Sequence, residues 1–221
     1  MNESVVLSGH IYIVDDDAAM CQALSFALTS AGHSVHAFRS PEPLLSLGPL
    51  PGPAAILLDM RLHEQSGVEV QAQLQARGQR IPVIFMSGQS QPQEIVQSFR
   101  QGALHFLLKP FSTADLLTVL QEALQQDQAR RAREAQAERL MTLVQRLTPR
   151  EREVCRLMLK GYPNRDIAAA HGTVAGTVKL QRASVMEKLQ VDKMAALAAL
   201  FEGEDPDLLL APETPPRNRQ A

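Results

Sequence analysis

Carboxylates and one lysine follow three short apolar segments of the chain. Asp15 and Asp16 come directly after the first segment, Asp59 ends the second, and Lys109 follows the third. Apolar runs this short and this sharply bounded are typical of buried parallel strands, whose carboxyl ends share one edge of a sheet. Ligands of open α/β sheets bind at that edge. We therefore expect these side chains to meet in one cleft, where a hard cation such as Mg²⁺ would offset the carboxylates and suit phosphoryl chemistry.

The first half of the chain alternates short apolar segments with amphipathic helical stretches. Helices are predicted over 18–31, ending at Gly32, and over 67–77, ending at Gly78. Five strands alternating with helices predict a doubly wound α/β fold, in which helices cover both faces of a parallel sheet. The predicted strands are 11–14, 34–38, 54–58, 82–86 and 104–108.

A long helix is predicted to follow this region. It begins with the capping-box pattern Ser112-Thr113-Ala114-Asp115, and no glycine or proline then occurs before Pro149. Residues 125–139 include no apolar side chain larger than alanine. This composition favours a solvated helical linker over a strong coiled coil, and it leaves alanine-mediated pairing open.

The next segment predicts two helices joined by a tight turn. A second capping box, Thr148-Pro149-Arg150-Glu151, opens a first helix, and Asn164 is expected to cap a short one. The turn His171-Gly172 leads into a longer helix over 175–190. A turn of this length between two helices is typical of a helix-turn-helix. Beyond Phe201 the acidic, proline-rich tail is predicted to be disordered.

Composition and charge limit the classes of protein. With 221 residues, 45% of them hydrophobic, the chain has room for one large domain or two small ones. It has no apolar run long enough for a membrane span and no pattern of a signal peptide, and Cys21 and Cys155 are expected to be separate buried thiols, so we expect a cytoplasmic protein. Residues 148–200 carry nine basic and five acidic side chains, whereas residues 1–120 carry six and ten. The basic excess indicates nucleic acid as a partner of the later segment.

Four motifs occur in a family-specific order. They are I-V-D-D-D, L-L-D-M-R-L, V-I-F-M-S-G and F-L-L-K-P-F, and together they resemble the receiver domain of two-component response regulators. The resemblance implies a flavodoxin-like domain over residues 8–125, in which Asp59 accepts a phosphoryl group from a phosphohistidine of a sensor histidine kinase. The ligands that it implies for Mg²⁺ are the acidic pair Asp15 and Asp16, Asp59 and the backbone carbonyl of Arg61.

The same resemblance implies a switch. Ser87 would hydrogen-bond the new phosphoryl group, Lys109 would supply a fixed positive charge, and Phe106 would swing inward when Ser87 turns. The Lys109–Pro110 peptide bond is expected to be cis. Asp17 is interpreted as a helix cap. His63 stands where the family usually has proline, and we interpret it as a tolerated loop substitution, with a role as metal ligand as the alternative.

Four further motifs, L-T-P-R-E-R-E-V, G-Y-P-N-R-D-I-A, T-V-K-L-Q-R and V-M-E-K-L, resemble the LuxR-type helix-turn-helix, and the whole chain is similar to regulators of the FixJ/NarL class, FixJ above all. The implied organisation is a receiver domain (8–125), a helical linker (126–146), a DNA-binding domain (147–201) and a tail (202–221). One face of the last long helix would enter the major groove of double-stranded promoter DNA. The residues implied in contacts are Lys179 and Leu180 near base edges, Ala183 beside them, and Arg182 and Lys188 at phosphates.

Several residues depart from the LuxR-type pattern. The turn usually reads Leu-Gly-Ile-Ser, but here it reads His171-Gly172-Thr173-Val174, in which Thr173 could replace the serine as helix cap. Gly176 weakens the following helix by about 1 kcal/mol relative to alanine. We expect these changes to alter the affinity for DNA and the target sequence.

Together these features predict a transcription regulator that is activated by phosphorylation and is not an enzyme, apart from possible slow self-dephosphorylation. Phosphorylated Asp59 would remodel the face formed by 93–101, 104–108 and the helix from Ser112, so that two receivers pair and two helix-turn-helix units bind paired half-sites. Two alternatives stay open. The output domain could bind a protein instead of DNA, or the chain could be a haloacid-dehalogenase-type phosphatase, which would need an acidic pair after the lysine where only Asp115 lies nearby.

Overall fold

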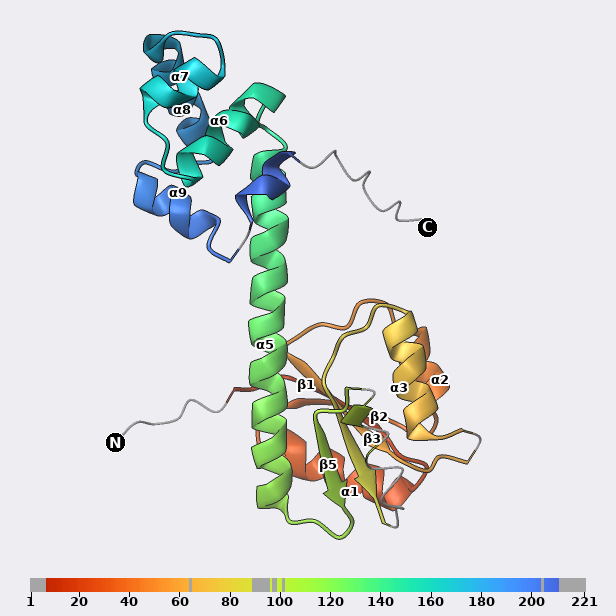
Figure 1. Ribbon diagram of the computed structural model, residues 1–221. Coiled ribbons are helices and arrows are strands. Elements are labelled where there is room, and N and C mark those ends of the chain that lie inside the picture. Colours follow the sequence, from red (N-terminus) through yellow and green to blue (C-terminus); the bar gives the residue numbers. More distant parts are fainter. Residues whose placement is uncertain are drawn as a thin grey trace, which may run out of the picture. The chain divides into compact units, whose positions relative to one another are not determined.

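The computed structural model describes residues 7–63, 65–88, 96, 99–100, 102–203 and 205–210 (Figure 1). The chain divides into two compact units, Met1–Arg133 and Glu134–Ala221. Residues 93–101, which are expected to contribute to the face that pairs two receivers, lie mostly outside the described residues.

The first unit contains a five-stranded, all-parallel sheet with the strand order β2-β1-β3-β4-β5. This topology confirms the predicted doubly wound fold, and the predicted strand bounds are within one residue of those observed. The strands are β1 (His10–Val14), β2 (Ser34–Phe38), β3 (Ala54–Asp59), β4 (Val83–Ser87) and β5 (His105–Leu108).

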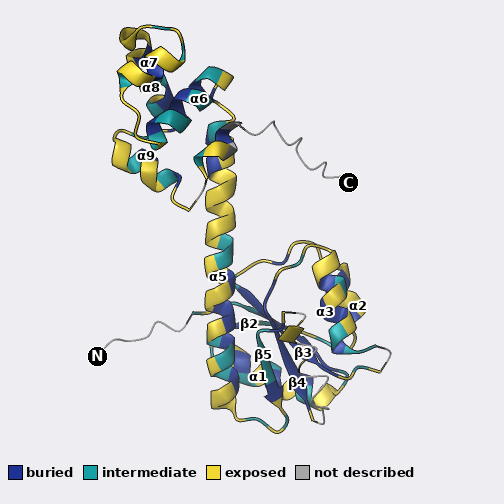
Figure 2. Ribbon diagram, viewed as in Figure 1, coloured by how far each residue is buried: buried dark blue, intermediate teal, exposed yellow. Residues whose placement is uncertain are grey.

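Helices cover both faces of this sheet, which explains why the central strands are continuous apolar runs. One face packs against α1 (Ala18–Ser30) and the first part of α5 (Thr113–Val144), and the other packs against α2 (Pro41–Ser46) and α3 (Gly67–Ala76) (Figure 1). Every residue of β3 is buried, and Figure 2 shows the sheet as the buried centre of this unit. Side chains alternate between the faces, with Ile11, Ile13 and Leu57 in one core and Tyr12, Ile56 and Leu58 in the other.

Local capping sets the helix ends as the sequence predicts. The Asp17 carboxylate accepts hydrogen bonds from the backbone N–H groups of Ala19 and Met20, at 2.8 and 3.3 Å, which confirms Asp17 as a cap. Gly32 and Gly78 follow α1 and α3 with φ of 90° and 76°, a conformation that favours glycine. The six-residue helix α2 was not predicted.

A buried carboxylate fixes α5 to the sheet. Asp127 is fully buried, and its Oδ2 accepts the backbone N–H of Ala54, at the start of β3, at 2.9 Å. Arg130 and Arg131 form ion pairs with the same carboxylate at 2.5 and 2.6 Å, and Arg131 also donates to the Leu50 carbonyl at 3.0 Å. The start of the expected solvated linker is therefore part of the first unit, and continuous exposure begins at residue 132 and ends at residue 139.

The second unit is helical. Its core contains Val154, Ile167, Val178, Val185 and Leu189, all of them almost fully buried. Besides the end of α5, its helices are α6 (Pro149–Leu159), α7 (Asn164–Ala170), α8 (Ala175–Lys188), α9 (Met194–Leu200) and the 3-10 helix η1 (Pro206–Leu210). The predicted capping box between Thr148 and Glu151 opens α6.

Two predicted caps in this unit are wrong. Asn164 is the first residue of α7 rather than its cap, because Pro163 takes the N-cap position. Val174, and not Thr173, is the N-cap of α8, and its apolar side chain makes no capping hydrogen bond. Helix α8 therefore begins without the side-chain cap that usually stabilises a first turn.

The tail expected to be disordered from residue 202 is structured over residues 205–210. Leu209 is buried in the core of the second unit, and Asp207 forms ion pairs with Lys160 and Arg156 of α6 at 2.7 and 3.2 Å. Leu209, two residues beyond Asp207, gives this segment a buried apolar contact, so the segment is structured in spite of its acidic composition. Residues 211–221 lie outside the described residues.

The Asp127 anchor makes a testable prediction. Asp127→Ala should lower the free energy of unfolding of the first unit by roughly 2–4 kcal/mol, because it leaves a buried N–H without a partner and removes the charge facing two arginines. Urea denaturation of the full chain, followed by circular dichroism, measures this loss. Glu138→Ala on the exposed part of α5 is the control, and equal effects of the two substitutions would contradict the anchor.

Candidate phosphorylation site and DNA-binding face

The carboxyl ends of four strands meet at one edge of the sheet. The register pairs Val14 with Leu58, Asp59 with Met86, and Ser87 with Leu108. The residues that end or directly follow β1, β3, β4 and β5 are therefore neighbours, although up to 94 positions separate them in the sequence. These are the residues that sequence analysis assigned to a cleft.

The centre of this edge is an ammonium group between two carboxylates. Lys109 Nζ lies 2.6 Å from Asp15 Oδ2 and 2.6 Å from Asp59 Oδ1. Asp15 is 1% exposed and Asp59 is 7% exposed, so water screens these charges poorly. The structure thus brings together three of the predicted site residues in one charged cluster.

For each of Asp59 and Lys109, burial and pairing shift the pKa in opposite directions. Burial raises the pKa of Asp59 above its ordinary value, although hydrogen bonds from Lys109 and the backbone N–H of Arg61 oppose this rise. Burial alone would lower the pKa of Lys109, but its bonds to Asp15 and Asp59 raise that pKa overall. Lys109 is therefore a permanent cation at neutral pH.

Backbone groups orient the two buried carboxylates. Asp59 Oδ2 accepts the Arg61 N–H at 2.9 Å, and Asp15 Oδ1 accepts the Asp17 N–H at 3.0 Å. Each acid thus uses one oxygen for the local chain and one for Lys109. This arrangement holds the carboxylates at the sheet edge before any substrate binds.

Asp16 faces a different neighbour. Its carboxylate contacts Nδ1 of His63, a side chain that is 82% exposed, and its own side chain is 26% exposed. A cavity of about 290 Å³ adjoins both residues and includes Arg39 and Glu42 in its lining. Sequence reasoning placed His63 near the cleft, but the contact with Asp16 depends on the loop conformation and was missed.

The donor set at this edge fits Mg²⁺ by chemistry. Carboxylate and backbone carbonyl oxygens are the hard ligands that this cation prefers, and the clustered negative charge requires a counter-charge. In the part of the chain that the structure describes, no three His, Cys, Asp or Glu side chains lie close enough together to hold a metal ion. Lys109 lies between Asp15 and Asp59, and Asp16 contacts His63 instead. Magnesium ligation by this set therefore remains a prediction.

The two residues of the expected switch lie on adjacent strands. Ser87 ends β4 and is 2% exposed, and its carbonyl accepts the Lys109 N–H at 2.7 Å. Phe106 of β5 is partly buried and packs against the core on the α2–α3 side. The Lys109–Pro110 bond is cis, as predicted.

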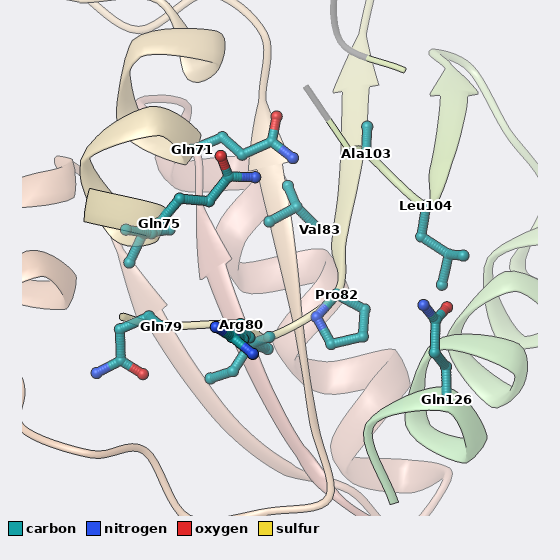
Figure 3. Close-up of a pocket in the computed structure, with 12 residues that line it drawn as sticks. Gln71, Gln75, Gln79, Arg80, Pro82, Val83, Ala103, Leu104 and Gln126 are labelled. Atoms are coloured by element: carbon teal, nitrogen blue, oxygen red, sulfur yellow. The ribbon is translucent and has the colours of Figure 1, made fainter. Parts of the chain in front are cut away.

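A second cavity lies at the opposite edge of the sheet. Its volume is about 430 Å³, and it is lined by α3, the start of β4, the residues before β5 and Gln126 of α5 (Figure 3). The Gln71 side chain is 1% exposed, and its Oε1 has no hydrogen-bond partner in the described part of the chain. None of the residues with predicted chemistry lies in this cavity.

The predicted DNA contacts lie on α8, but its basic residues differ in their surroundings. Lys179, Leu180 and Ala183 are exposed, and Leu180 is 74% exposed. Lys188, however, donates to both carboxylate oxygens of Glu151 at 2.7 and 2.6 Å, and Arg182 lies at 3.5 Å from the Tyr162 carbonyl oxygen. Sequence reasoning missed the ion pair of Lys188, since 37 positions separate the two residues.

Glu151 links two helices of the second unit, α6 and α8. Burial alone would raise its pKa, but hydrogen bonds from Lys188, Ser184 and the backbone of Thr148 lower that pKa to about 2. The carboxylate thus attaches the C-terminal half of α8 to the start of α6. Cys21 and Cys155 are both free and buried, as the sequence predicts.

Family models match both units. The response regulator receiver domain matches residues 11–121, and the luxR family of bacterial regulatory proteins matches residues 145–201. The tetrathionate response regulatory protein TtrR of Salmonella typhimurium is 35% identical over 87% of this chain and 91% of its own length. The transcriptional regulatory protein FixJ of Bradyrhizobium diazoefficiens is 32% identical over 87% of this chain and 94% of its own length.

Solved structures agree with these matches. The response regulator StyR has a TM-score of 0.78 and 34% identity, and the comparison covers 87% of this chain and 98% of StyR. Full-length FixJ has a TM-score of 0.52 and 32% identity, with 88% and 96% covered.

The chain belongs to the response regulator family, and it combines a receiver domain with a LuxR-type DNA-binding domain. It is a transcriptional response regulator and not a typical enzyme. None of the helices that the structure describes has both the length and the apolar character needed to span a bilayer.

The low pKa of Glu151 gives a prediction about pH. A carboxylate whose pKa is depressed stabilises the fold above its ordinary pKa, and this contribution is lost as the pH falls from about 4.5 to about 2. Glu151→Gln, which keeps the capping box, should therefore destabilise the second unit by roughly 1–3 kcal/mol at pH 7 and much less near pH 2. Thermal unfolding between these pH values measures the difference.

Glu187→Gln is the control, because Glu187 is an exposed acid of α8 in the same unit. A difference between the parent protein and Glu151→Gln that stays constant from pH 7 to pH 2 would contradict the role of the charged pair.

Proposed function

We propose that this response regulator controls transcription through phosphorylation of Asp59 by a partner sensor histidine kinase in the cytoplasm. The observation that carries the proposal is the position of Lys109 Nζ, 2.6 Å from both Asp15 and Asp59, at the carboxyl edge of the sheet. A fixed cation beside a buried carboxylate is the arrangement that phosphoryl transfer to that carboxylate requires.

The proposed reaction is a transfer from nitrogen to oxygen. A carboxylate oxygen of Asp59 attacks the phosphorus of a phosphohistidine, the phosphorus–nitrogen bond breaks, and the kinase histidine leaves. Lys109 then pairs with the oxygens of the acyl phosphate instead of with the Asp59 carboxylate. Mg²⁺, when bound, would supply further positive charge to those oxygens, and its ligands would be Asp15, Asp16, Asp59 and the Arg61 carbonyl.

Transmission of the signal is proposed to begin at Ser87. This residue is buried next to the acceptor and would turn to hydrogen-bond the phosphoryl group, which gives Phe106 room to move inward. The face formed by β5, the start of α5 and residues 93–101 would then pair two receivers into a homodimer. Residues 93–101 lie mostly outside the described part of the chain, so the described part of this proposed dimer face consists mainly of β5 and the start of α5.

The proposed output is binding of double-stranded promoter DNA by residues 147–201, connected to the receiver domain (8–125) through the helical linker (126–146). The basic excess of residues 148–200 and the LuxR-family match over 145–201 support this output. The exposed face of α8, with Lys179 and Leu180, would enter the major groove. Arg182 and Lys188 would add phosphate contacts only if they leave the partners that they have in this structure.

One observation favours a second candidate, in which the output unit binds a protein. Lys188 is paired with Glu151, while Leu180 is 74% exposed, and exposed apolar side chains are common at protein interfaces. A phosphatase of the haloacid-dehalogenase type has no such support.

Phosphorylation of Asp59 is tested by labelling. The full chain incubated with Mg²⁺ and radiolabelled acetyl phosphate should become labelled, and Asp59→Asn should lose at least about 95% of the label because it removes the attacking carboxylate. Asp17→Asn is the matched control, since Asp17 caps α1 outside the cluster and asparagine is an equally good cap. Equal labelling of the parent protein and Asp59→Asn would overturn the acceptor assignment.

Binding to DNA is tested by its salt dependence. The association constant of the phosphorylated full chain for promoter fragments should fall with salt concentration, with a slope of about −0.9 for each phosphate contact in a double-logarithmic plot. Lys179→Ala should weaken binding, and the change in slope shows whether Lys179 contacts a phosphate. A slope near zero, or no binding, would favour the protein partner instead.

A further inference from the structure

The outward face of α8 has an unusual composition for a DNA-reading helix. Helical spacing places Gly176, Leu180, Ala183 and Glu187 along one side, and all four are exposed. The opposite side is the buried one that holds Val178 and Val185. The centre line of this face therefore has no hydrogen-bonding side chain before Glu187, while Lys179 lies at its flank beside Leu180.

Gly176 is not required by the fold. Its φ lies outside the left-handed region, and an added Cβ would meet no heavy atom within 4 Å among the described residues. Gly67, in contrast, leaves no room for a Cβ, which would collide with the carbonyl oxygen of Asp59. A glycine in a helix costs stability relative to alanine, so the fold gains nothing from Gly176.

Leu180 is equally unexplained by packing. It is 74% exposed in the middle of a 14-residue helix and lies outside the apolar core of its unit. Among the cations of α8, which the structure describes in full, Lys179 is the one without an intramolecular partner, because Arg182 lies near the Tyr162 carbonyl and Lys188 pairs with Glu151. Lys179 is therefore the cation of α8 that can bond to a phosphate or to a guanine, and any further discrimination of bases by this face must come from its apolar side chains.

We propose that α8 reads DNA by apolar contact with thymine methyl groups, through Leu180 and Ala183, and that Gly176 lets the helix backbone approach the bases closely. The thymine 5-methyl is the apolar group that base pairs display in the major groove, and aliphatic side chains recognise it. The N-terminal part of a recognition helix lies nearest the bases, and glycine there allows the closest approach of the backbone. This inference rests on the proposed binding of DNA by the second unit.

Selection followed by removal of single methyl groups tests the inference. Duplexes that bind the full chain, treated with acetyl phosphate and Mg²⁺, are selected from a random library, and each thymine of the enriched site is replaced in turn by deoxyuridine. At one or two positions this change should weaken binding about 3- to 5-fold, the effect of losing one buried methyl group. The Leu180→Ala variant should bind the thymine duplex more weakly than the parent protein does. At one of these positions it should bind the thymine duplex and the deoxyuridine duplex equally well. Met141→Ala, which removes an exposed apolar side chain from α5, should discriminate like the parent protein.

The close approach at Gly176 has a test of its own. Gly176→Ala should leave Tm unchanged or raise it by roughly 2–4 °C, since the added methyl meets open space and favours the helix. The same variant should bind the selected duplex at least about 3-fold more weakly, and Gly176→Leu more weakly still. If the fold required this glycine, the substitution would instead lower Tm and leave the affinity for the duplex unchanged.

The outcomes separate this inference from the proposed function. If no duplex is enriched and none binds, binding of DNA itself is wrong. If a site is enriched but deoxyuridine has no effect at any position, or if Gly176→Ala binds as tightly as the parent protein, thymine reading by this face is wrong while DNA binding stands.

Discussion

The ammonium group of Lys109, held between the buried carboxylates of Asp15 and Asp59, is the interaction on which the first unit depends. Two acids this close and this well buried would repel each other without a cation between them. The parallel sheet makes the cluster possible, because it brings the ends of strands that are distant in the sequence to one edge. Any change of charge on Asp59 must alter the bonds of Lys109 and the surroundings of Ser87, so the cluster is suited to act as a switch.

The second unit uses an ion pair for a different purpose. Glu151 binds Lys188 and Ser184 of the recognition helix and the backbone at the start of α6, and these bonds fix the helix within its unit. Because the pair engages a cation of α8, fewer cations of this helix would remain for the phosphates of the proposed DNA partner. The exposed face of α8 contains glycine, leucine and alanine, so in the proposed complex with DNA apolar contact would contribute to the reading of the sequence.

A third buried charge decides where the first unit ends. Asp127 extends the contact of α5 with the sheet beyond the last leucine of that helix segment, through the Ala54 N–H and two arginines. Composition alone places the boundary of the linker at the end of the apolar pattern, whereas the hydrogen bonds place it several residues later. Residues 132–139 then follow as a fully exposed stretch of helix.

The sequence by itself determined the positions of the strands and the order of the motifs that follow them. It also determined the caps at Asp17 and Thr148, the buried thiols and the residues of the charged cluster. These features depend on periodicity, on capping within three or four positions, and on motifs that resemble a known family. Only the tertiary structure decided the partners of Asp16, Asp127, Lys188 and Asp207. These contacts join residues 37, 47 or 73 positions apart, or they depend on a loop conformation. Local chemistry specifies which elements form, whereas contacts of long charged side chains follow from how the folded elements meet.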